Sequence, residues 1–153
     1  MLLKKIISGG QTGIDRAALD LALELGISHG GYCPKGRRSE DGMISTIYDL
    51  IELESTKYED RTLKNVESSE GTLILHSGII SHGTALTKEL CIEKCKPILI
   101  INILDDVNSS RLNFTRWLTE NSIECLNVAG QRESECEIYN NAKNILRYLL
   151  SDK

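Results

Sequence analysis

Residues 3–25 read LKKIISGGQTGIDRAALDLALEL, and this stretch decides the fold. Two isoleucines at positions 6 and 7 predict a short strand, and a helical pattern of apolar residues begins at Ile14. The turn between them contains Gly9, Gly10 and Gly13. A strand, a glycine-rich turn and a helix in this order aim the unsatisfied N–H groups of a helix N-terminus at an anion. The stretch therefore predicts an α/β unit with an anion site at its turn.

The residues of this turn suit a ligand. Paired glycines allow positive φ and let the backbone come close to a ligand, where a Cβ atom would collide. Thr12 can cap the helix or donate a hydrogen bond, and Asp15 suits the positive end of the helix dipole. The turn matches neither the G-x-G-x-x-G pattern nor a Walker loop. A tight turn that only connects a strand to a capped helix is the alternative.

The length and charge of the chain exclude several classes of function. With 153 residues, we expect one domain, residues 1–153, with a full hydrophobic core. The net charge is −4 and no block of Lys and Arg stands out beyond residues 35–38, so we expect no nucleic-acid partner. No apolar run approaches the roughly 20 residues that span a bilayer, and no leader precedes the first predicted strand. We therefore expect a cytoplasmic protein with no membrane partner.

Metal binding through cysteine or histidine is poorly supported. The five cysteines include no C-x-x-C pair, and we expect them to be free thiols, mostly small buried side chains. The histidines, at positions 29, 76 and 82, show neither H-x-x-x-H nor H-E-x-x-H spacing. We expect structural, hydrogen-bonded histidines, with His82 as the exception to watch because it lies in a glycine-containing loop.

The rest of the chain alternates strands with helices. Further strands are predicted at residues 29–33, 71–76, 97–103 and 126–129, while residues 48–53 form a strand or an irregular packed segment. Further helices are predicted at residues 58–68, 85–95, 107–121 and 138–150. Right-handed crossovers between such elements give an α/β fold: a three-layer, doubly wound, mainly parallel sheet with helices on both faces.

Three further polar loops follow predicted strands. Residues 77–84, SGIISHGT, supply hydroxyls and N–H groups where a helix begins. Residues 34–38, PKGRR, add cations, and the alternative for this loop is a solvated segment that pairs with the acids at positions 40 and 41. Residues 130–134, GQRES, form a third glycine-led turn. Because ligands of open parallel sheets bind at the carboxyl ends of strands, we expect these loops to gather at one sheet edge near a strand-order reversal.

These motifs together resemble the molybdenum cofactor carrier protein family. The matching segments are SGGQTGIDRAALDLAL (8–23), GGYCPKGRRSEDG (30–42), GTLIL with SG and ISHGTALT (71–87), and NVAGQRES with IYNNA (127–142). That family is part of a wider Rossmann-like group that also holds the Lonely-Guy-type phosphoribohydrolases. The resemblance implies a Rossmann-like fold, a homo-oligomer (dimer or tetramer), binding of the phosphorylated pterin of molybdenum cofactor, and molybdoenzymes as partners.

The resemblance also bears on catalysis. The hydrolases of the group show a P-G-G-x-G-T-x-x-E pattern, whose glutamate drives glycosidic cleavage. Here the position three residues after Thr84 is Thr87, and Glu89 would project about 200° around a helix from it. His82 stands where relatives carry a glycine, which narrows the backbone freedom of the loop. We therefore favour a protein without catalytic residues over an enzyme.

Two functions of different class follow from this reasoning. In a carrier of molybdenum cofactor, a phosphate-bearing small molecule, the N–H groups of the two glycine loops would hold the phosphate and basic residues of the PKGRR loop would add charge. A nucleoside 5′-monophosphate phosphoribohydrolase would instead need a carboxylate, for which Asp15, Glu40, Asp41 and Glu133 are available. A sensor of a nucleotide-derived ligand would differ from the carrier only in its ligand. The candidate cofactor-binding residues are Gly9, Gly10, Gln11, Thr12, Gly13, Asp15, Arg16, Lys35, Gly36, Arg37, Ser77, Gly78, Ser81, His82, Gly83, Thr84 and Thr87.

Overall fold

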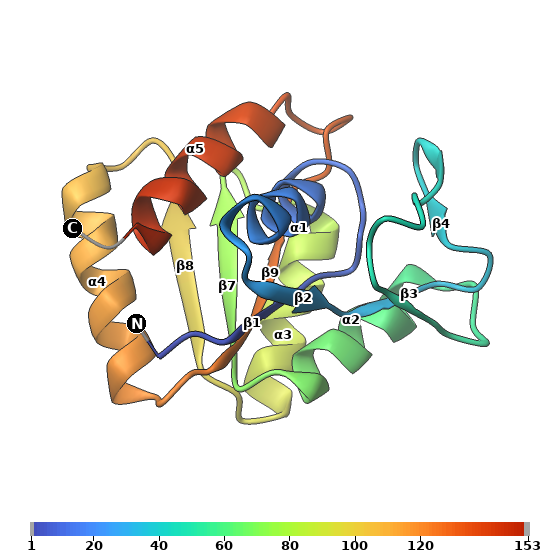
Figure 1. Ribbon diagram of the computed structural model, residues 1–153, viewed down its shortest axis with the longest axis horizontal. Helices are drawn as coiled ribbons and strands as arrows, with labels where there is room; N and C mark the ends of the chain where they lie inside the picture. Colours follow the sequence, from blue (N-terminus) through green and yellow to red (C-terminus); the bar gives the residue numbers. More distant parts are fainter. Residues whose placement is uncertain (1, 152–153) are drawn as a thin grey trace.

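A five-stranded, all-parallel sheet forms the centre of the computed structural model, which describes residues 2–151 (Figure 1). Its strand order is β2-β1-β9-β7-β8. The strands are β1 (Lys5–Ile7), β2 (Ser28–Gly30), β7 (Gly71–His76), β8 (Ile98–Asn102) and β9 (Cys125–Gly130). The last strand, β9, lies between β1 and β7, so the strand order reverses at the middle of the sheet. The predicted parallel, doubly wound sheet is confirmed.

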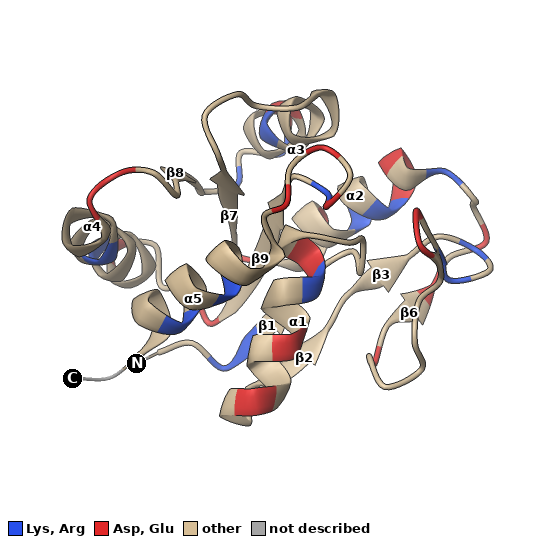
Figure 2. Ribbon diagram, turned by 90° about the horizontal axis from the view of Figure 1, so that it is seen from above, with Lys and Arg blue, Asp and Glu red and all other residues tan. Residues whose placement is uncertain are grey.

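Helices cover both faces of this sheet (Figures 1 and 2). On one face lie α1 (Ile14–Leu25), α4 (Val107–Glu120) and α5 (Tyr139–Leu150). On the other lie α2 (Tyr58–Ser68) and α3 (His82–Glu93). The bounds of α2 and β7 coincide with the prediction, whereas α3 begins three residues earlier than predicted, with Ser81 as its N-cap.

The main hydrophobic core lies between the sheet and the layer of α1, α4 and α5. Leu73 and Leu75 of β7 point into it and are fully buried together with Phe114 of α4. Burial of one such side chain contributes about 1.5–3 kcal/mol. The opposite face of the sheet carries buried polar groups, among them Thr72 and Asn127, whose side chains share a hydrogen bond of 3.2 Å. The face under α2 and α3 is therefore the polar one.

The structure corrects the prediction for residues 29–53. The predicted strand 29–33 is divided at Gly31, where φ is 126° and a Cβ atom would lie 2.1 Å from the carbonyl oxygen of Ser8. Its second part, β3 (Tyr32–Cys33), leaves the main sheet and pairs with β6 (Ile51–Glu52), the only two residues of the predicted segment 48–53 that form a strand. The PKGRR loop thus follows a side ladder and continues into an antiparallel hairpin, β4 (Arg38–Ser39) and β5 (Gly42–Met43).

A second, small apolar cluster fixes this side region to α1. Leu19 of α1 packs there with Cys33, Ile44, Tyr48 and Leu50, all of which are buried. Within residues 2–151, no helix has both the length and the apolar content that crossing a membrane requires.

Candidate functional site

The three glycine-led turns meet at the carboxyl edge of the sheet, as predicted. Gln131, in the turn after β9, joins the other two. Its side-chain carbonyl accepts a hydrogen bond from the N–H of Ser77 (2.8 Å), and its backbone carbonyl accepts one from Ile14 (3.1 Å). The hydroxyl of Thr12 in the first turn accepts a further bond from the N–H of Glu133 (3.1 Å). The edge where the strand order reverses is therefore one connected hydrogen-bonded surface.

The chain itself fills the space that the glycines of the first turn leave. A Cβ atom on Gly9 would lie 1.8 Å from Nη1 of Arg61, and one on Gly10 (φ 76°) would lie 2.7 Å from Cδ1 of Leu50. At Gly13 (φ 78°) it would lie 2.4 Å from the carbonyl oxygen of Gln131. The predicted close approach of a ligand to these glycines is therefore replaced by close packing of the protein against them.

Some of the N–H groups of the first turn have acceptors within the protein. Gln11 donates its N–H to the carboxylate of Asp15 (3.2 Å), and Thr12 donates to the side-chain oxygen of Gln11 (3.1 Å). Ile14, the first residue of α1, donates to the carbonyl of Gln131. Within residues 2–151, the N–H groups of Gly9, Gly10 and Gly13 have no hydrogen-bond acceptor. The protein atoms packed beside the glycines, rather than a lack of free N–H groups, therefore distinguish this turn from an open site.

The loop after β7 is open. Ser81 caps α3 by accepting a hydrogen bond from the N–H of Thr84 (3.3 Å), and its hydroxyl donates to that of Thr84 (2.9 Å). Within residues 2–151, the N–H groups of His82 and Gly83 in the first turn of α3 have no hydrogen-bond acceptor. A Cβ atom on Gly83 would meet nothing within 4 Å. This helix N-terminus therefore has the free donors that anion binding requires.

A cavity of about 290 Å³, here called the α3 pocket, opens beside this N-terminus. It brings together residues far apart in the sequence. Seven of the predicted site residues line it, namely Gln11, Asp15, Ser81, His82, Gly83, Thr84 and Thr87. The hydroxyl of Thr87 donates to the carbonyl of Gly83 (3.1 Å), which ties it to its own helix.

Two arginines of the α3 pocket, Arg61 and Arg132, escaped the sequence reasoning. Arg61 of α2 lies 3.0 Å from the carboxylate of Asp15, and both side chains are largely buried. Burial raises the pKa of Asp15 above its ordinary value, and the charge of Arg61 opposes this shift. Arg132 directly follows Gly130 and Gln131, so its place in the third turn was a usable signal, whereas nothing in the sequence around Arg61 indicated its role.

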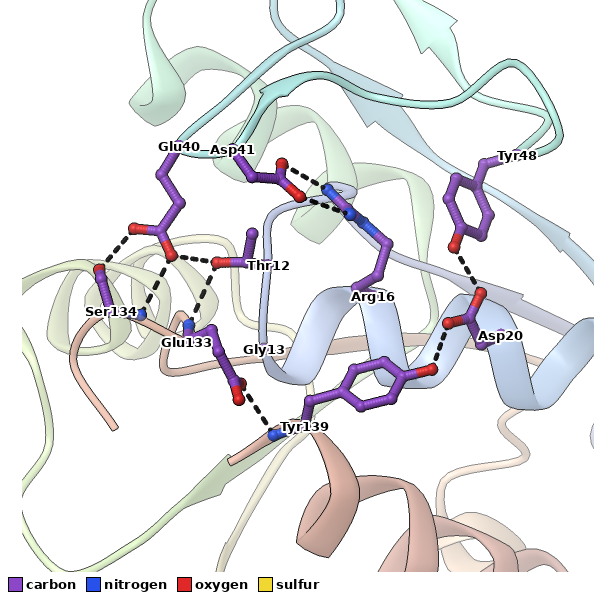
Figure 3. A pocket seen from close by; sticks show the side chains of 10 residues that line it. All are labelled: Thr12, Gly13, Arg16, Asp20, Glu40, Asp41, Tyr48, Glu133, Ser134 and Tyr139. Atoms are coloured by element: carbon purple, nitrogen blue, oxygen red, sulfur yellow. Dashed lines mark hydrogen bonds and ion pairs between the residues drawn. The ribbon is translucent and has the colours of Figure 1, made fainter. Parts of the chain in front are cut away.

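A larger cavity of about 680 Å³ lies on the other side of the first turn, between α1, the β4–β5 hairpin and the start of α5 (Figure 3). We call it the α1–α5 pocket. The predicted residues Thr12, Gly13 and Arg16 line it together with Asp20, Glu40, Tyr48, Asp41, Glu133, Ser134 and Tyr139. Its lining thus holds four carboxylates against one guanidinium, which disfavours an anion there.

The carboxylates of this pocket are already bonded, as Figure 3 shows. Arg16 donates to both oxygens of Asp41 (3.1 and 3.2 Å), and these bonds hold the pKa of that carboxyl below its usual range. Tyr48 donates to Asp20 (2.5 Å), and Tyr139 donates to its other oxygen.

Glu40 links the β4–β5 hairpin to the first and third turns. Burial opposes its ionisation, but bonds from Ser134 (2.5 Å) and from the hydroxyl of Thr12 outweigh this and lower the pKa of Glu40. The acids of the α1–α5 pocket therefore act as structural acceptors.

The predicted residues of the PKGRR loop lie away from both pockets. Lys35 is exposed, with Nζ 3.6 Å from a carboxylate oxygen of Glu54, and the N–H of Gly36 donates to Glu52 (2.5 Å). The guanidinium of Arg37 donates to four backbone carbonyls of the segment after β5, those of residues 44, 45, 48 and 50. Its charge is used to hold the loop, so the structure gives Arg37 no part in an anion site.

Known proteins share this architecture. The family model described as the circularly permutated YpsA SLOG family matches residues 6–150. The chain belongs to this family. A crystal structure from Syntrophus aciditrophicus SB, named "Putative molybdenum carrier protein", is 40% identical, with 98% of this chain and 96% of that chain covered and a TM-score of 0.95. The predicted resemblance to the molybdenum carrier family is thereby confirmed. No protein of curated function matches the chain.

Proposed function

We propose that this protein carries a phosphate-bearing cofactor, molybdenum cofactor in particular, with the phosphate held at the N-terminus of α3. The observation that carries the proposal is the pair of N–H groups of His82 and Gly83, which have no acceptor within residues 2–151 and border the α3 pocket. The positive end of the helix dipole adds to their attraction for an anion. The name of the similar solved structure supports molybdenum cofactor as the ligand.

The residues of the α3 pocket support binding more than catalysis. Asp15, the buried carboxylate in this pocket, is bonded to Arg61 and to the N–H of Gln11, so it is held as an ion-pair partner. Thr87 occupies the place of the glutamate of the hydrolases. In such a carrier the cofactor supplies its own chemistry, and the protein supplies binding and shielding. Among residues 2–151, no group of three or more His, Cys, Asp or Glu side chains could hold a metal ion. The molybdenum would thus travel bound to the pterin rather than to the protein.

The experiment that tests this proposal changes Gly83, because a side chain there meets open space. An aspartate in the first turn of α3 complements the helix dipole and preserves the fold, but its charge repels an anion at the same N–H groups. We expect Gly83→Asp to weaken the binding of inorganic phosphate about tenfold or more, the cost of one opposed charge–charge contact near a protein surface. Gly83→Asn, of the same shape without the charge, is the matched control and should bind much more tightly than the aspartate variant.

Titration calorimetry with phosphate measures both variants and the wild type, and mass spectrometry of material released from the purified wild type identifies the natural ligand. A phosphorylated pterin would support the carrier function in full. If Gly83→Asp binds phosphate as tightly as the wild type, the anion lies elsewhere and the proposed site is wrong. We also expect a homodimer or homotetramer, and molybdoenzymes as recipients of the cofactor, which light scattering and transfer assays would test.

A further inference from the structure

Three arginines surround one tyrosine at the edge of the α3 pocket. The guanidinium carbons of Arg38, Arg132 and Arg61 lie 4.5, 5.2 and 5.7 Å from the ring centroid of Tyr58. They come from the β4–β5 hairpin, the turn after β9 and α2, so the fold brings three distant segments to one ring. A cation within about 6 Å of an aromatic ring is attracted to the ring face. Tyr58 thus holds together three like charges that would otherwise repel one another.

Carboxylates neutralise this cluster only in part. Arg61 is paired with the buried Asp15 at 3.0 Å. Arg132 has Glu135 at 3.6 Å, a partly exposed contact that is long for a hydrogen bond. Arg38 donates to the backbone carbonyl of Thr56 (3.3 Å), and within residues 2–151 no carboxylate lies within 4 Å of it. Glu59 also lines the α3 pocket, but in this described part of the chain no ion pair within 4 Å joins it to an arginine. Arg38 and Arg132 therefore keep guanidinium donors that no close carboxylate of the described residues occupies.

Two of the three arginines and the α3 N-terminus border the same cavity, and Arg38 lies against Tyr58, which also lines it. Tyr58, Arg61 and Arg132 line the α3 pocket together with Ser81 and Gly83. The cavity measures about 290 Å³, and a water molecule takes up about 30 Å³ of liquid volume. A single phosphate at α3 would leave much of this space empty, next to the arginines.

From this arrangement we propose that Arg38, Arg61 and Arg132 form a second anion subsite, so that the α3 pocket takes ligands with two anionic groups, of which a diphosphate is the simplest. The inference rests on the proposed function, because it assigns the first anionic group to the N-terminus of α3. Guanidinium groups suit this role because their planar donors bind phosphate and carboxylate oxygens in pairs. Arg61 already forms an ion pair with Asp15, so Arg38 and Arg132 are the guanidinium groups available to bind the second anionic group.

The test compares inorganic phosphate with pyrophosphate by titration calorimetry at one fixed ionic strength. The proteins are the wild type, Arg38→Gln, Arg132→Gln and the double variant. The matched control is Arg116→Gln, which removes one positive charge from an exposed position on α4. Thermal unfolding of each variant checks that the fold is kept.

We expect the wild type to bind pyrophosphate about tenfold or more tightly than phosphate, because charge-assisted bonds to guanidinium groups are strong. This preference should fall severalfold in each single variant and nearly vanish in the double variant, while phosphate affinity changes little. Arg116→Gln should leave both affinities as they are.

Distinct outcomes separate this inference from the proposed function. If phosphate binds and pyrophosphate binds no more tightly, the second subsite does not exist, and the carrier proposal stands. If the arginine variants lose phosphate and pyrophosphate equally, these residues serve the first anionic group and the inference is wrong. If neither anion binds the wild type, both proposals fail.

Discussion

The turn after β1 and the loop after β7 occupy equivalent places in the sheet, yet protein atoms pack into the first and leave the second empty. In the first, Arg61, Leu50 and the backbone of residue 131 occupy the space beside the glycines. In the second, a side chain on Gly78 or Gly83 would meet nothing within 4 Å. The N–H groups alone do not make this division, because within residues 2–151 those of Gly9, Gly10 and Gly13 lack an acceptor, as do those of His82 and Gly83 at the start of α3.

This difference shows that a glycine at a strand–helix turn serves one of two purposes. It can admit another part of the chain, which makes the turn a structural joint, or it can leave room for a ligand. The atoms around the missing Cβ distinguish the two cases. In this protein, hydrogen bonds connect the first turn, the turn after β9 and the start of the loop after β7. The open part of that last loop lies beside these connections, at the same edge of the sheet.

The largest expected difference in stability is between two variants that each add one methyl group, one in the first turn and one in the open loop. Gly13→Ala would force an alanine to φ 78° with its Cβ 2.4 Å from a carbonyl oxygen that cannot move freely. We expect the free energy of unfolding to fall by about 3–6 kcal/mol, from backbone strain and overpacking together. Gly83→Ala lies in open space within α3 and should leave stability unchanged or raise it by about 0.5–1 kcal/mol. Urea unfolding of both variants measures the contrast, and equal losses would contradict the division into a joint and an open loop.

A smaller effect is expected from breaking the ion pair that covers the first turn. Arg61→Gln removes the cation beside the buried carboxylate of Asp15, and we expect a loss of about 3 kcal/mol at neutral pH, typical of a buried pair with one partner removed. The control is Arg147→Gln, which breaks an exposed contact of 2.6 Å with Glu24 and should change stability very little.

The pH dependence of Arg61→Gln follows from the raised pKa of Asp15. Burial already raises this pKa in the wild type, and loss of the arginine raises it further. The folded variant then binds a proton more readily than the unfolded chain, so its stability is greatest below the unfolded pKa and is lost as pH rises through the folded pKa. Urea unfolding at several pH values should show the gap to the wild type narrowing toward acid pH. A gap independent of pH would mean that lost packing over Gly9, not the charge of Asp15, causes the loss.

Sequence reasoning predicted the sheet well because its strands are buried runs. Residues 71–76, GTLILH, are buried throughout and were predicted to the residue, as was α2. It failed where long-range packing decides the conformation. The bend at Gly31 depends on the carbonyl of Ser8, and residues 32–53 pair only among themselves and pack on α1 rather than joining the main sheet.

The candidate site was predicted in part for the same reason. A cap residue and a glycine at a helix start can be read locally, so Ser81, Gly83 and Thr84 were identified, and the structure places them around one pocket. The opposite roles of the two glycine loops could not be predicted from the sequence, because they depend on whether distant side chains, here Arg61 and Leu50, pack against the glycines. The charge of Arg37 was likewise misjudged, since its four carbonyl partners lie 7 to 13 residues further along the chain.

The smallest expected effect concerns catalysis and should be none. We expect that adenosine monophosphate incubated with the wild type releases no adenine above background, because Thr87 stands at the glutamate position of the hydrolases and the buried Asp15 is bonded to Arg61. A positioned acid or base typically contributes a factor of about 10²–10⁴ to rate. The open loop would thus bind a phosphate without cleaving a glycosidic bond, while the carboxylates of the α1–α5 pocket stay bonded on the other side of the first turn.

Thr87 allows this expectation to be tested in both directions. Its side chain is buried and lines a small cavity with Asp15 and Arg61, so Thr87→Glu would place a carboxylate where the hydrolases carry one, and Thr87→Gln gives the same size without the charge. Adenine release by Thr87→Glu alone would show that the α3 pocket is a hydrolase site without its acid. Release by the wild type, stopped by Asp15→Asn or Glu133→Gln in a folded protein, would instead mean that a carboxylate from the joint acts in the open loop. The carrier proposal would then be wrong, and the separation of the two regions would be structural but not functional.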